Sequence, residues 1–408
     1  MNVLDDTALM RSRAEPAGHD TTWVWNGYSM AERDRRWHAL RTRAAAEGLD
    51  CIFVPLGDGY DGRYLTQYLN AAAILPTDGR PPIAIATEHE AANAWLPDVR
   101  RVSSAWGPTM AEALIEAGMA RGRIGVAGLK GGAVGYARTP DGVINHTAYA
   151  EVQRRLPNVT FVDATDLVMS VRARKSEEEL DCMRRAVGIA EAGFDQLIEL
   201  ARPGVDANEL YASVMERMLE LGTEYYNSIA MTIDPIGARG THRYLSPPIP
   251  HRLEPNDLIA TEANTLYGGQ ATQEQQLVVL GPIPDLYRSY VEMQRELFEG
   301  SLALLKPGAT FGEIVDYILG YGKGRGVKSL VMIKGPGLGE EGPFAAPTGT
   351  ARPEARAVRF EAGNALVWKP VIYSEDMRTQ FIWGGCVIVH DDGPEVVGKR
   401  PQGLVSIQ

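Results

Sequence analysis

The stretch LEPNDLIATEAN at 253–264 decides the fold, because FEAGNALVWKPV at 360–371 repeats its pattern residue by residue. The offset between the two stretches, from 253 to 360, is a constant 107. The likeness extends upstream, where ELARPGVDANELYASVMERMLELG at 199–222 is similar to ALLKPGATFGEIVDYILGYGKGRG at 303–326. Each of these longer segments reads as a helix, a Pro-Gly turn, a second capped helix and a glycine. The sequence therefore contains a large internal repeat.

The repeat occurs in two copies only, which favours one domain built from two related α+β halves. A solenoid needs three or more stacked units. A duplication of this kind creates a pseudo-twofold axis with a cleft between the halves. Equivalent strand positions face each other across that cleft, and the offset pairs Glu262 with Lys369. One half offers a carboxylate and the other an ammonium.

A separate α/β domain is predicted before the repeat, at residues 21–168, after an N-terminal tail at 1–20. Its first helix opens with a capping box, Ser29 and Glu32, and stops at Gly48. Short apolar strands then alternate with helices in the rhythm of a βα layered domain. The predicted strands are 51–55, 81–87, 123–128 and 159–164, and the predicted helices include 109–118 and 145–156.

The second domain is predicted at 169–408. A second capping box, Ser176 with Glu179, opens a long helix that ends at the Arg-Pro-Gly of 202–204. The basic stretch VRARK at 171–175 precedes this helix. We interpret it as the hinge between the domains.

Composition excludes several classes of protein. The 408 residues are 45% hydrophobic and 23% charged, which is typical of a globular chain and not of a disordered or fibrous one. The 41 basic and 52 acidic residues give a net charge of -11, which repels nucleic acid and anionic membranes and predicts that neither is a partner.

The three cysteines show no CxxC and no Cys/His cluster, which favours a reducing compartment over a disulfide scaffold. No secretory h-region and no run of about 18 apolar residues occurs. We therefore predict a cytoplasmic protein with no membrane segment.

The order and spacing of several motifs resemble the creatinase, prolidase and methionine aminopeptidase clan. The resemblance covers nearly the whole chain and implies a pita-bread fold for the second domain. The matching segments are VRARKSEEELDCMRRA at 171–186, GTHRYLSPP at 240–248, NDLIATEANTLYGGQATQEQQL at 256–277, IKGPGLGEEGPF at 333–344, and VWKPVIY and WGGCVIVHDDG within 367–393.

The metallopeptidases of this clan bind two metals through two aspartates eleven residues apart, one histidine and two late glutamates. This sequence departs from them at every ligand. The aspartate positions hold Glu262 and Gln273, the histidine position holds Pro336, and the first late glutamate is Lys369. The last ligand falls at Trp383 or Gly384, and neither supplies a carboxylate. Proline cannot ligate, and a lysine is protonated near neutral pH, so we predict no metal and no cofactor.

The resemblance to creatinase, which works without a metal, suggests other site residues. An arginine of its N-terminal domain binds the substrate carboxylate, and the matching residue is Arg80. Its proton-shuttling histidine lies upstream of the strand with the lost ligands, where this sequence has His242. Imidazole suits that role because it both takes and gives protons near neutral pH. The position of a further creatinase glutamate holds Gln275, with Glu274 beside it.

Two interpretations of Glu262 and Lys369 stay open. They form a structural ion pair in place of a metal, or they orient a zwitterionic substrate. We predict His242, Glu262 and Lys369 as catalytic residues, and Arg80, Gln273, Glu274 and Gln275 as substrate-binding residues. Since side chains alternate along a strand, Glu274 need not share a face with its two glutamine neighbours.

The predicted function is metal-independent hydrolysis of an amidino, amide or cyclic amidine C–N bond in a small polar nitrogen compound. His242 activates water and then protonates the leaving nitrogen. A lyase acting on a small carboxylate or betaine, and a non-catalytic binding protein, are the alternatives. An Xaa-Pro metallopeptidase is the least favoured. A homodimer is expected, because in creatinase-like relatives the N-terminal domain of one chain completes the site of the other.

Overall fold

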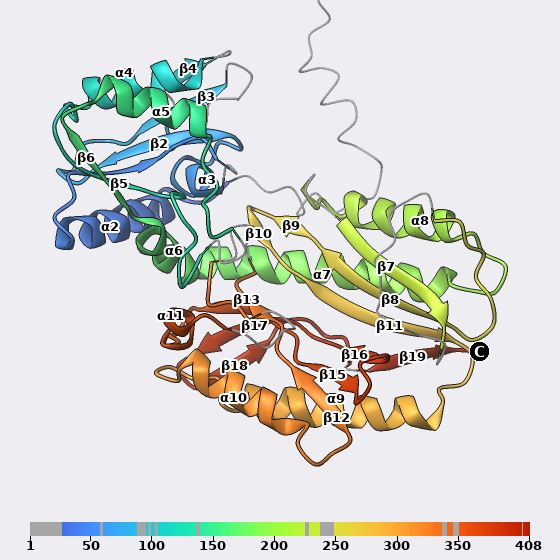
Figure 1. The fold of residues 1–408 in the computed structure, drawn as a ribbon. Helices are drawn as coiled ribbons and strands as arrows, with labels where there is room; N and C mark the ends of the chain where they lie inside the picture. Colours follow the sequence, from blue (N-terminus) through green and yellow to red (C-terminus); the bar gives the residue numbers. More distant parts are fainter. Residues whose placement is uncertain are drawn as a thin grey trace, which may run out of the picture.

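The computed structural model describes residues 27–408, except for 58–59, 88–94, 97–98, 103–104, 136–138, 225–227, 237–248, 337–340, 346–350 and 402. The predicted tail at 1–20 and His242 therefore lie outside the described residues. Figure 1 shows two parts, an α/β domain that contains the elements from α2 to α6 and a larger α+β domain. The predicted fold class is confirmed.

A six-stranded sheet forms the centre of the N-terminal domain, in the order β4-β3-β2-β1-β5-β6. Along β1, Ile52 and Val54 pack under α2, α3 and α6, whereas Cys51 and Phe53 face α4 and α5. This two-residue alternation sandwiches the sheet between two helical layers. The strands are β1 (Cys51–Val54), β2 (Ala71–Pro76), β3 (Ile83–Thr87), β4 (Arg100–Val102), β5 (Gly122–Val126) and β6 (Val159–Asp163), and the helices are α2 (Met30–Ala46), α3 (Tyr60–Thr66), α4 (Trp106–Glu116), α5 (His146–Arg155) and α6 (Thr165–Ala173).

Both predicted capping residues begin helices. Ser29 accepts from the Glu32 amide at the start of α2, and Ser176 forms a complete capping box with Glu179 at the start of α7 (Glu177–Leu200). The Glu32 side chain does not return to its cap, because it pairs with Arg35 and Arg36 instead.

The C-terminal domain places its strands between two pairs of helices. In Figure 1, α7 and α8 (Ala207–Glu220) lie on one side of the strands, and α9 (Asp285–Leu302) and α10 (Phe311–Tyr321) lie on the other. One sheet has the order β19-β11-β8-β7, and the others are β13-β14-β17-β18, β12-β15-β16 and β10-β9. The strands are β7 (Ser228–Pro235), β8 (Asp257–Asn264), β9 (Leu266–Tyr267), β10 (Gln270–Ala271), β11 (Glu274–Leu280), β12 (Val327–Leu330), β13 (Ile333–Lys334), β14 (Ala365–Trp368), β15 (Val371–Ser374), β16 (Gln380–Ile382), β17 (Gly385–His390), β18 (Gly393–Val396) and β19 (Leu404–Ile407), with a short helix α11 (Pro353–Arg356).

The duplication is visible in matched backbone hydrogen bonds. The Gly204 amide donates to the Leu253 carbonyl at 2.7 Å, and the Gly308 amide donates to the Phe360 carbonyl at 2.8 Å. The return bonds correspond as well, from Leu253 to Val205 and from Phe360 to Ala309. Each Pro-Gly turn is thus tied to the residue that leads into the equivalent strand of its half.

Helix α6 joins the two domains. The predicted boundary after residue 168 falls inside this helix, and its Leu167, Val168 and Val171 pack in the N-terminal core. The division into domains at that residue stays a prediction. Within the described ranges, no helix is both long enough and apolar enough to cross a membrane. The cysteines, Cys51, Cys182 and Cys386, are buried and form no disulfide.

Candidate functional site

Glu262 and Lys369, one from each half of the repeat, meet between the halves. The Lys369 Nζ lies 2.6 Å from the Glu262 Oε2, and the ammonium also donates to the Gln273 Oε1. The Lys369 side chain is fully buried, and that of Glu262 is 12% exposed. The Gln273 Nε2 completes the group by donating to the Glu262 Oε1 at 2.6 Å. A buried cation therefore holds a carboxylate and an amide oxygen together.

The alternation of side chains along β8 and β14 explains this meeting. Ile259 and Ala263 of β8 pack with α7 and α8, whereas Leu366 and Trp368 of β14 pack with α9 and α10. The intervening positions on each strand turn toward the other half. Glu262 continues the inward face of β8, and Lys369 directly follows the end of β14.

Gln275 joins the group from β11, because it lies directly opposite Glu262 in the antiparallel pairing of β8 and β11. Its Nε2 is 3.5 Å from the Glu262 Oε2. Its Oε1 is buried and has no hydrogen-bond partner within the described part of the chain. Gln273 and Gln275 thus share the Glu262 face of the sheet.

Glu274 lies on the opposite face of β11. Its carboxylate accepts from the Thr272 hydroxyl at 2.6 Å and from the Cys386 amide at 2.9 Å. Burial raises the pKa of the Glu274 carboxyl to about 7, and these two hydrogen bonds offset only part of that effect. These bonds hold the Glu274 carboxylate away from Glu262. A substrate-binding role for Glu274 stays a prediction.

Two consecutive glycines, which sequence reasoning did not single out as site residues, admit these charged side chains. A Cβ at Gly384 would lie 2.8 Å from the Lys369 Cγ and 2.0 Å from the Trp368 carbonyl oxygen. A Cβ at Gly385 would lie 1.7 Å from the Glu274 Oε2. The Gly-Gly pair beside a strand was the available signal, because glycine there often marks a close approach of another group.

A cavity of about 200 Å³ opens beside Glu262. Six of its ten lining residues have polar side chains, and the other four are apolar. The lining residues are Thr232, Ala260, Thr261, Glu262, Gln275, Leu277, Met332, Tyr373, Gln380 and Ile382. Burial raises the pKa of the Tyr373 hydroxyl, so this phenol stays protonated near neutral pH.

Arg80, which is predicted to bind substrate, does not line the cavity of its own chain. It follows β2 in the N-terminal domain, is half exposed, and pairs with Asp78 at 2.7 Å. His242 belongs to the segment 237–248, which lies outside the described residues. Both roles stay predictions.

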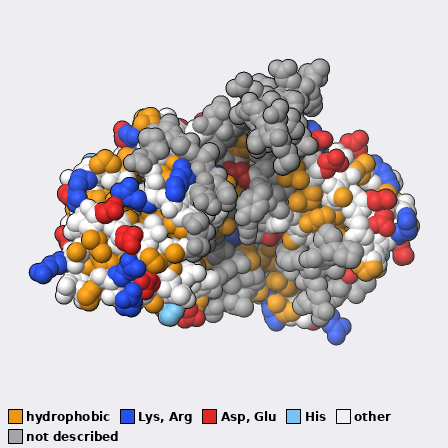
Figure 2. Space-filling model, turned by 90° about the horizontal axis from the view of Figure 1, so that it is seen from above, with side chains coloured by type: hydrophobic (Ala, Val, Ile, Leu, Met, Phe, Trp, Pro, Cys, Tyr) orange, Lys and Arg blue, Asp and Glu red, His pale blue; other side chains and the backbone are white. Residues whose placement is uncertain are grey.

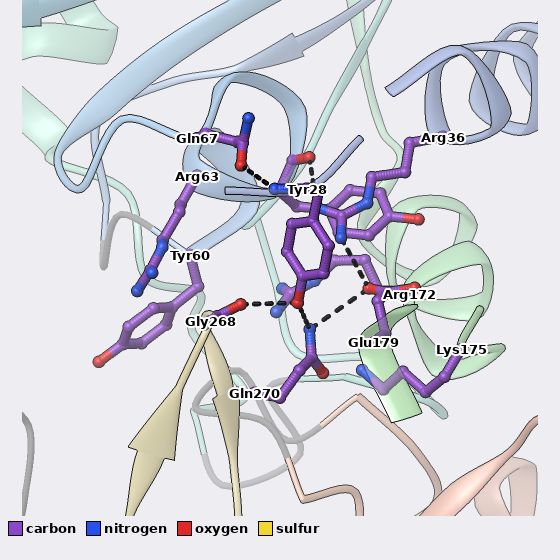
Figure 3. Close-up of a pocket in the computed structure, with 12 residues that line it drawn as sticks. Tyr28, Arg36, Tyr60, Arg63, Gln67, Arg172, Lys175, Glu179, Gly268 and Gln270 are labelled. Carbon is purple, nitrogen blue, oxygen red and sulfur yellow. Dashed lines mark hydrogen bonds and ion pairs between the residues drawn. The ribbon is translucent and has the colours of Figure 1, made fainter. Parts of the chain in front are cut away.

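A buried ionic junction connects the N-terminal domain to α7 and to the hairpin of β9 and β10 (Figure 3). Glu179 of α7 accepts from Arg35 at 2.8 Å and lies 3.2 Å from an Arg36 nitrogen. The Tyr28 hydroxyl donates to the Gly268 carbonyl at 2.7 Å, and the Gln270 Nε2 donates to that hydroxyl at 3.2 Å. The junction fixes the hairpin that leads into β11.

The predicted hinge contributes a second junction. Lys175 lies 2.6 Å from Glu341, and Arg172 pairs with Asp61 at 2.6 Å and approaches Glu341 at 3.5 Å. Burial alone raises the pKa of the Glu341 carboxyl, but the two cations outweigh it and lower the pKa to about 2. The basic residues of the hinge therefore clamp the domains together.

The described side chains on the face shown in Figure 2 mix acidic, basic and hydrophobic groups, and no single sign of charge dominates it.

Comparison with known proteins finds similarity to peptidases and to a creatinase. The model of metallopeptidase family M24 matches residues 181–392. The chain is 32% identical to an uncharacterised hydrolase/peptidase, y4tM, of Sinorhizobium fredii over 40% of this chain and 42% of that protein. It is 23% identical to a creatinase of a Bacillus species, covering 69% of this chain and 68% of the creatinase. It is 24% identical to an Xaa-Pro dipeptidase of Lactobacillus helveticus, covering 45% and 54%.

Solved structures share the fold over nearly their whole length. An Xaa-Pro dipeptidase of Bacillus anthracis superposes with a TM-score of 0.71 at 17% identity, covering 92% of this chain and all of that one. The dipeptidase PepE of Mycobacterium ulcerans gives 0.71 at 20% identity, covering 93% and 99%. The aligned sequences span about half of y4tM and of the Lactobacillus dipeptidase. The predicted family is confirmed and, at the level of the family, so is the prediction of an enzyme.

The family name implies a metal, but the described residues do not fit one. The Lys369 ammonium lies between the Glu262 carboxylate and the Gln273 amide, where it repels a cation. Pro336 and Gly384 carry no donor side chain. Across the described ranges, no three His, Cys, Asp or Glu side chains converge as a metal site would require.

Proposed function

This chain belongs to metallopeptidase family M24, and from that premise we propose that it hydrolyses a C–N bond of a small nitrogen compound without a metal. The observation that carries the proposal is the buried ammonium of Lys369 beside Glu262 and Gln273. In this proposal the Lys369 ammonium, which belongs to the chain itself, takes the place of an exchangeable metal ion at the centre of the site.

The polar groups support a proton-transfer mechanism. His242 takes a proton from water as the water oxygen bonds to the carbon of the scissile C–N bond. The same imidazolium then protonates the nitrogen as that bond breaks, so the atoms of one water are divided between the products. His242 belongs to the segment that connects β7 to β8, and residues of both strands line the cavity.

Lys369 has an electrostatic role in this proposal. Its charge offsets the developing negative charge of the attacked group, and its ammonium pairs with the Glu262 carboxylate at 2.6 Å. Glu262, in turn, orients the amide of Gln275 toward itself.

Xaa-Pro dipeptidase activity is the second candidate, and the comparisons favour it. Named relatives and solved neighbours include Xaa-Pro dipeptidases, and one of these structures aligns over its full length. The ligand chemistry described above argues against it, because the positions that hold metal ligands in the clan hold Lys369, Gln273 and Pro336 here.

One experiment separates these functions. Purified protein is analysed for bound metals and then incubated in ¹⁸O-labelled water with Xaa-Pro dipeptides, guanidino acids, cyclic amidines, lactams and ureas, with and without a chelator. We expect ¹⁸O in a product of a small nitrogen compound and no effect of the chelator.

Other outcomes overturn the proposal. Stoichiometric Mn, Fe, Co or Zn with chelator-sensitive Xaa-Pro cleavage establishes the second candidate. Product without ¹⁸O indicates a lyase, and no turnover of any compound indicates a binding protein. As a matched pair, Lys369→Met abolishes turnover, whereas Lys328→Met, at an exposed lysine of β12, preserves it.

A further inference from the structure

The cavity beside Glu262 has little net charge despite its carboxylate. Among the described residues that line it, Glu262 alone carries a charge, and the Lys369 ammonium at 2.6 Å neutralises that charge. A cationic ligand would therefore compete with a buried, covalently attached cation for the same carboxylate. An anionic ligand would be repelled by Glu262, which lines the cavity, whereas the Lys369 ammonium is buried and does not line it.

Gln275 supplies a hydrogen-bond acceptor. The Glu262 carboxylate only accepts hydrogen bonds, so the Gln275 amide must turn its NH₂ group toward it. Its carbonyl oxygen is then fixed on the other side of the amide and has no partner within the described residues. A buried acceptor without a donor is costly, and an N–H group of a ligand would remove that cost.

Tyr373 supplies a donor on the wall formed by β15. Its protonated hydroxyl is a neutral donor, and the buried Gln275 oxygen is a neutral acceptor. Ala260, Leu277, Met332 and Ile382 supply the apolar wall, and the other neutral polar side chains that line the cavity are those of Thr232, Thr261 and Gln380. At about 200 Å³, the cavity is smaller than the pockets of roughly 300–1,000 Å³ that hold drug-sized ligands. The walls suit a compact apolar body with one neutral N–H and one C=O.

From these contacts we propose that the cavity binds an uncharged amide, lactam or urea and discriminates against the corresponding guanidinium or amidinium. The inference rests on the proposed function in treating this cavity as the substrate site. It narrows the predicted amide or amidine substrates to the neutral amide class.

The test uses ligand pairs that match in shape and differ in charge: 2-pyrrolidone against 2-iminopyrrolidine, and methylurea against methylguanidine, by calorimetric titration near pH 7. For wild-type protein we expect the neutral member to bind about tenfold more tightly or better, which corresponds to one well-formed hydrogen bond. Equal or tighter binding of the cations overturns the proposal.

Gln275→Glu adds a carboxylate at the acceptor position and should shift the preference toward the cations by about tenfold or more. The control, Gln153→Glu, makes the same charge change at an exposed position of α5 and should leave the preference unchanged. An unchanged preference in folded Gln275→Glu also overturns the proposal. Should that variant fail to fold, the wild-type comparison decides alone.

The proposed function and the cavity assignment can be overturned independently of each other. If the neutral ligands bind selectively and none is hydrolysed, the cavity assignment stands and hydrolysis is wrong. If a cationic amidine is hydrolysed and preferred, hydrolysis stands and the cavity assignment is wrong.

Discussion

The Lys369 ammonium lies 2.6 Å from the Glu262 carboxylate, although the two residues come from opposite halves of a duplicated domain. Removing one partner of a buried pair leaves an uncompensated charge. We expect Lys369→Met to lower the free energy of unfolding by roughly 3–5 kcal/mol, and the double change with Glu262→Gln to recover much of the loss. Urea denaturation of the four proteins in the cycle measures this.

An exposed pair serves as the control for that cycle. Arg288 and Asp285, at the start of α9, lie 3.3 Å apart in solvent, so removing either should change stability by less than about 0.5 kcal/mol. A coupling energy between Lys369 and Glu262 below about 0.5 kcal/mol would show that the two side chains do not interact in solution.

Glu274 should make stability depend on pH in an unusual direction. Its pKa is about 7 in the fold against an ordinary 4.5, so the folded protein retains a proton that the unfolded chain has released. The stabilisation is complete below pH 4.5 and is lost as the pH rises through about 7. The loss amounts to roughly 3 kcal/mol, because one pKa unit corresponds to about 1.4 kcal/mol.

Glu274→Gln should remove this part of the pH profile, since an amide does not titrate. Denaturation midpoints between pH 4.5 and 8 test the point, with Glu292→Gln on the exposed face of α9 as the control. Identical profiles for wild type and Glu274→Gln would contradict the prediction.

Lys175 should matter for acid stability through Glu341. The low pKa of Glu341 contributes stability above its ordinary value of 4.5, and this contribution is lost as the pH falls toward 2. Lys175→Met should therefore destabilise the protein by roughly 3–5 kcal/mol at pH 7 and shift acid unfolding to higher pH. Circular dichroism along an acid titration measures both, and an unshifted acid transition would refute the clamp.

Arg80 leads to a test of the expected homodimer. If Arg80 of one chain completes the cleft of another, Arg80→Ala and Glu262→Gln proteins are each inactive alone. When the two proteins are mixed and their subunits exchange, roughly a quarter of the wild-type activity should return. Half of the dimers then contain one chain of each kind, and each of these has one complete site out of two. Sedimentation of only a 44.5 kDa species, or no restored activity, contradicts this arrangement.

Local signals and the repeat predicted much of the fold from sequence. Ser176 and Glu179 begin α7 as expected, because a capping box depends only on neighbouring residues. The constant offset predicted that Glu262 and Lys369 meet, since equivalent positions of a duplicated domain face each other across its axis. The alternation along β11 likewise separated Glu274 from Gln273 and Gln275.

Contacts between distant segments could not be predicted in this way. Nothing in the local sequence shows that Glu341 pairs with Lys175, or that Arg35 reaches Glu179. The spaces at Gly384 and Gly385 depend on side chains more than a dozen residues away, Lys369 and Glu274. The strand β2 was also missed, because three of its six residues are alanines, which are depleted in strands.

The pairing of β19 with β11 has a consequence for the order of folding. Leu404–Ile407 forms the parallel neighbour of Leu277–Leu280, so the sheet of the first half gains this strand only after the second half has been synthesised. Parallel pairing across so long a stretch of chain carries a large loop-closure entropy and forms slowly. During synthesis the open side of β11 is a free strand edge, which can pair with another chain until Leu404–Ile407 has been made.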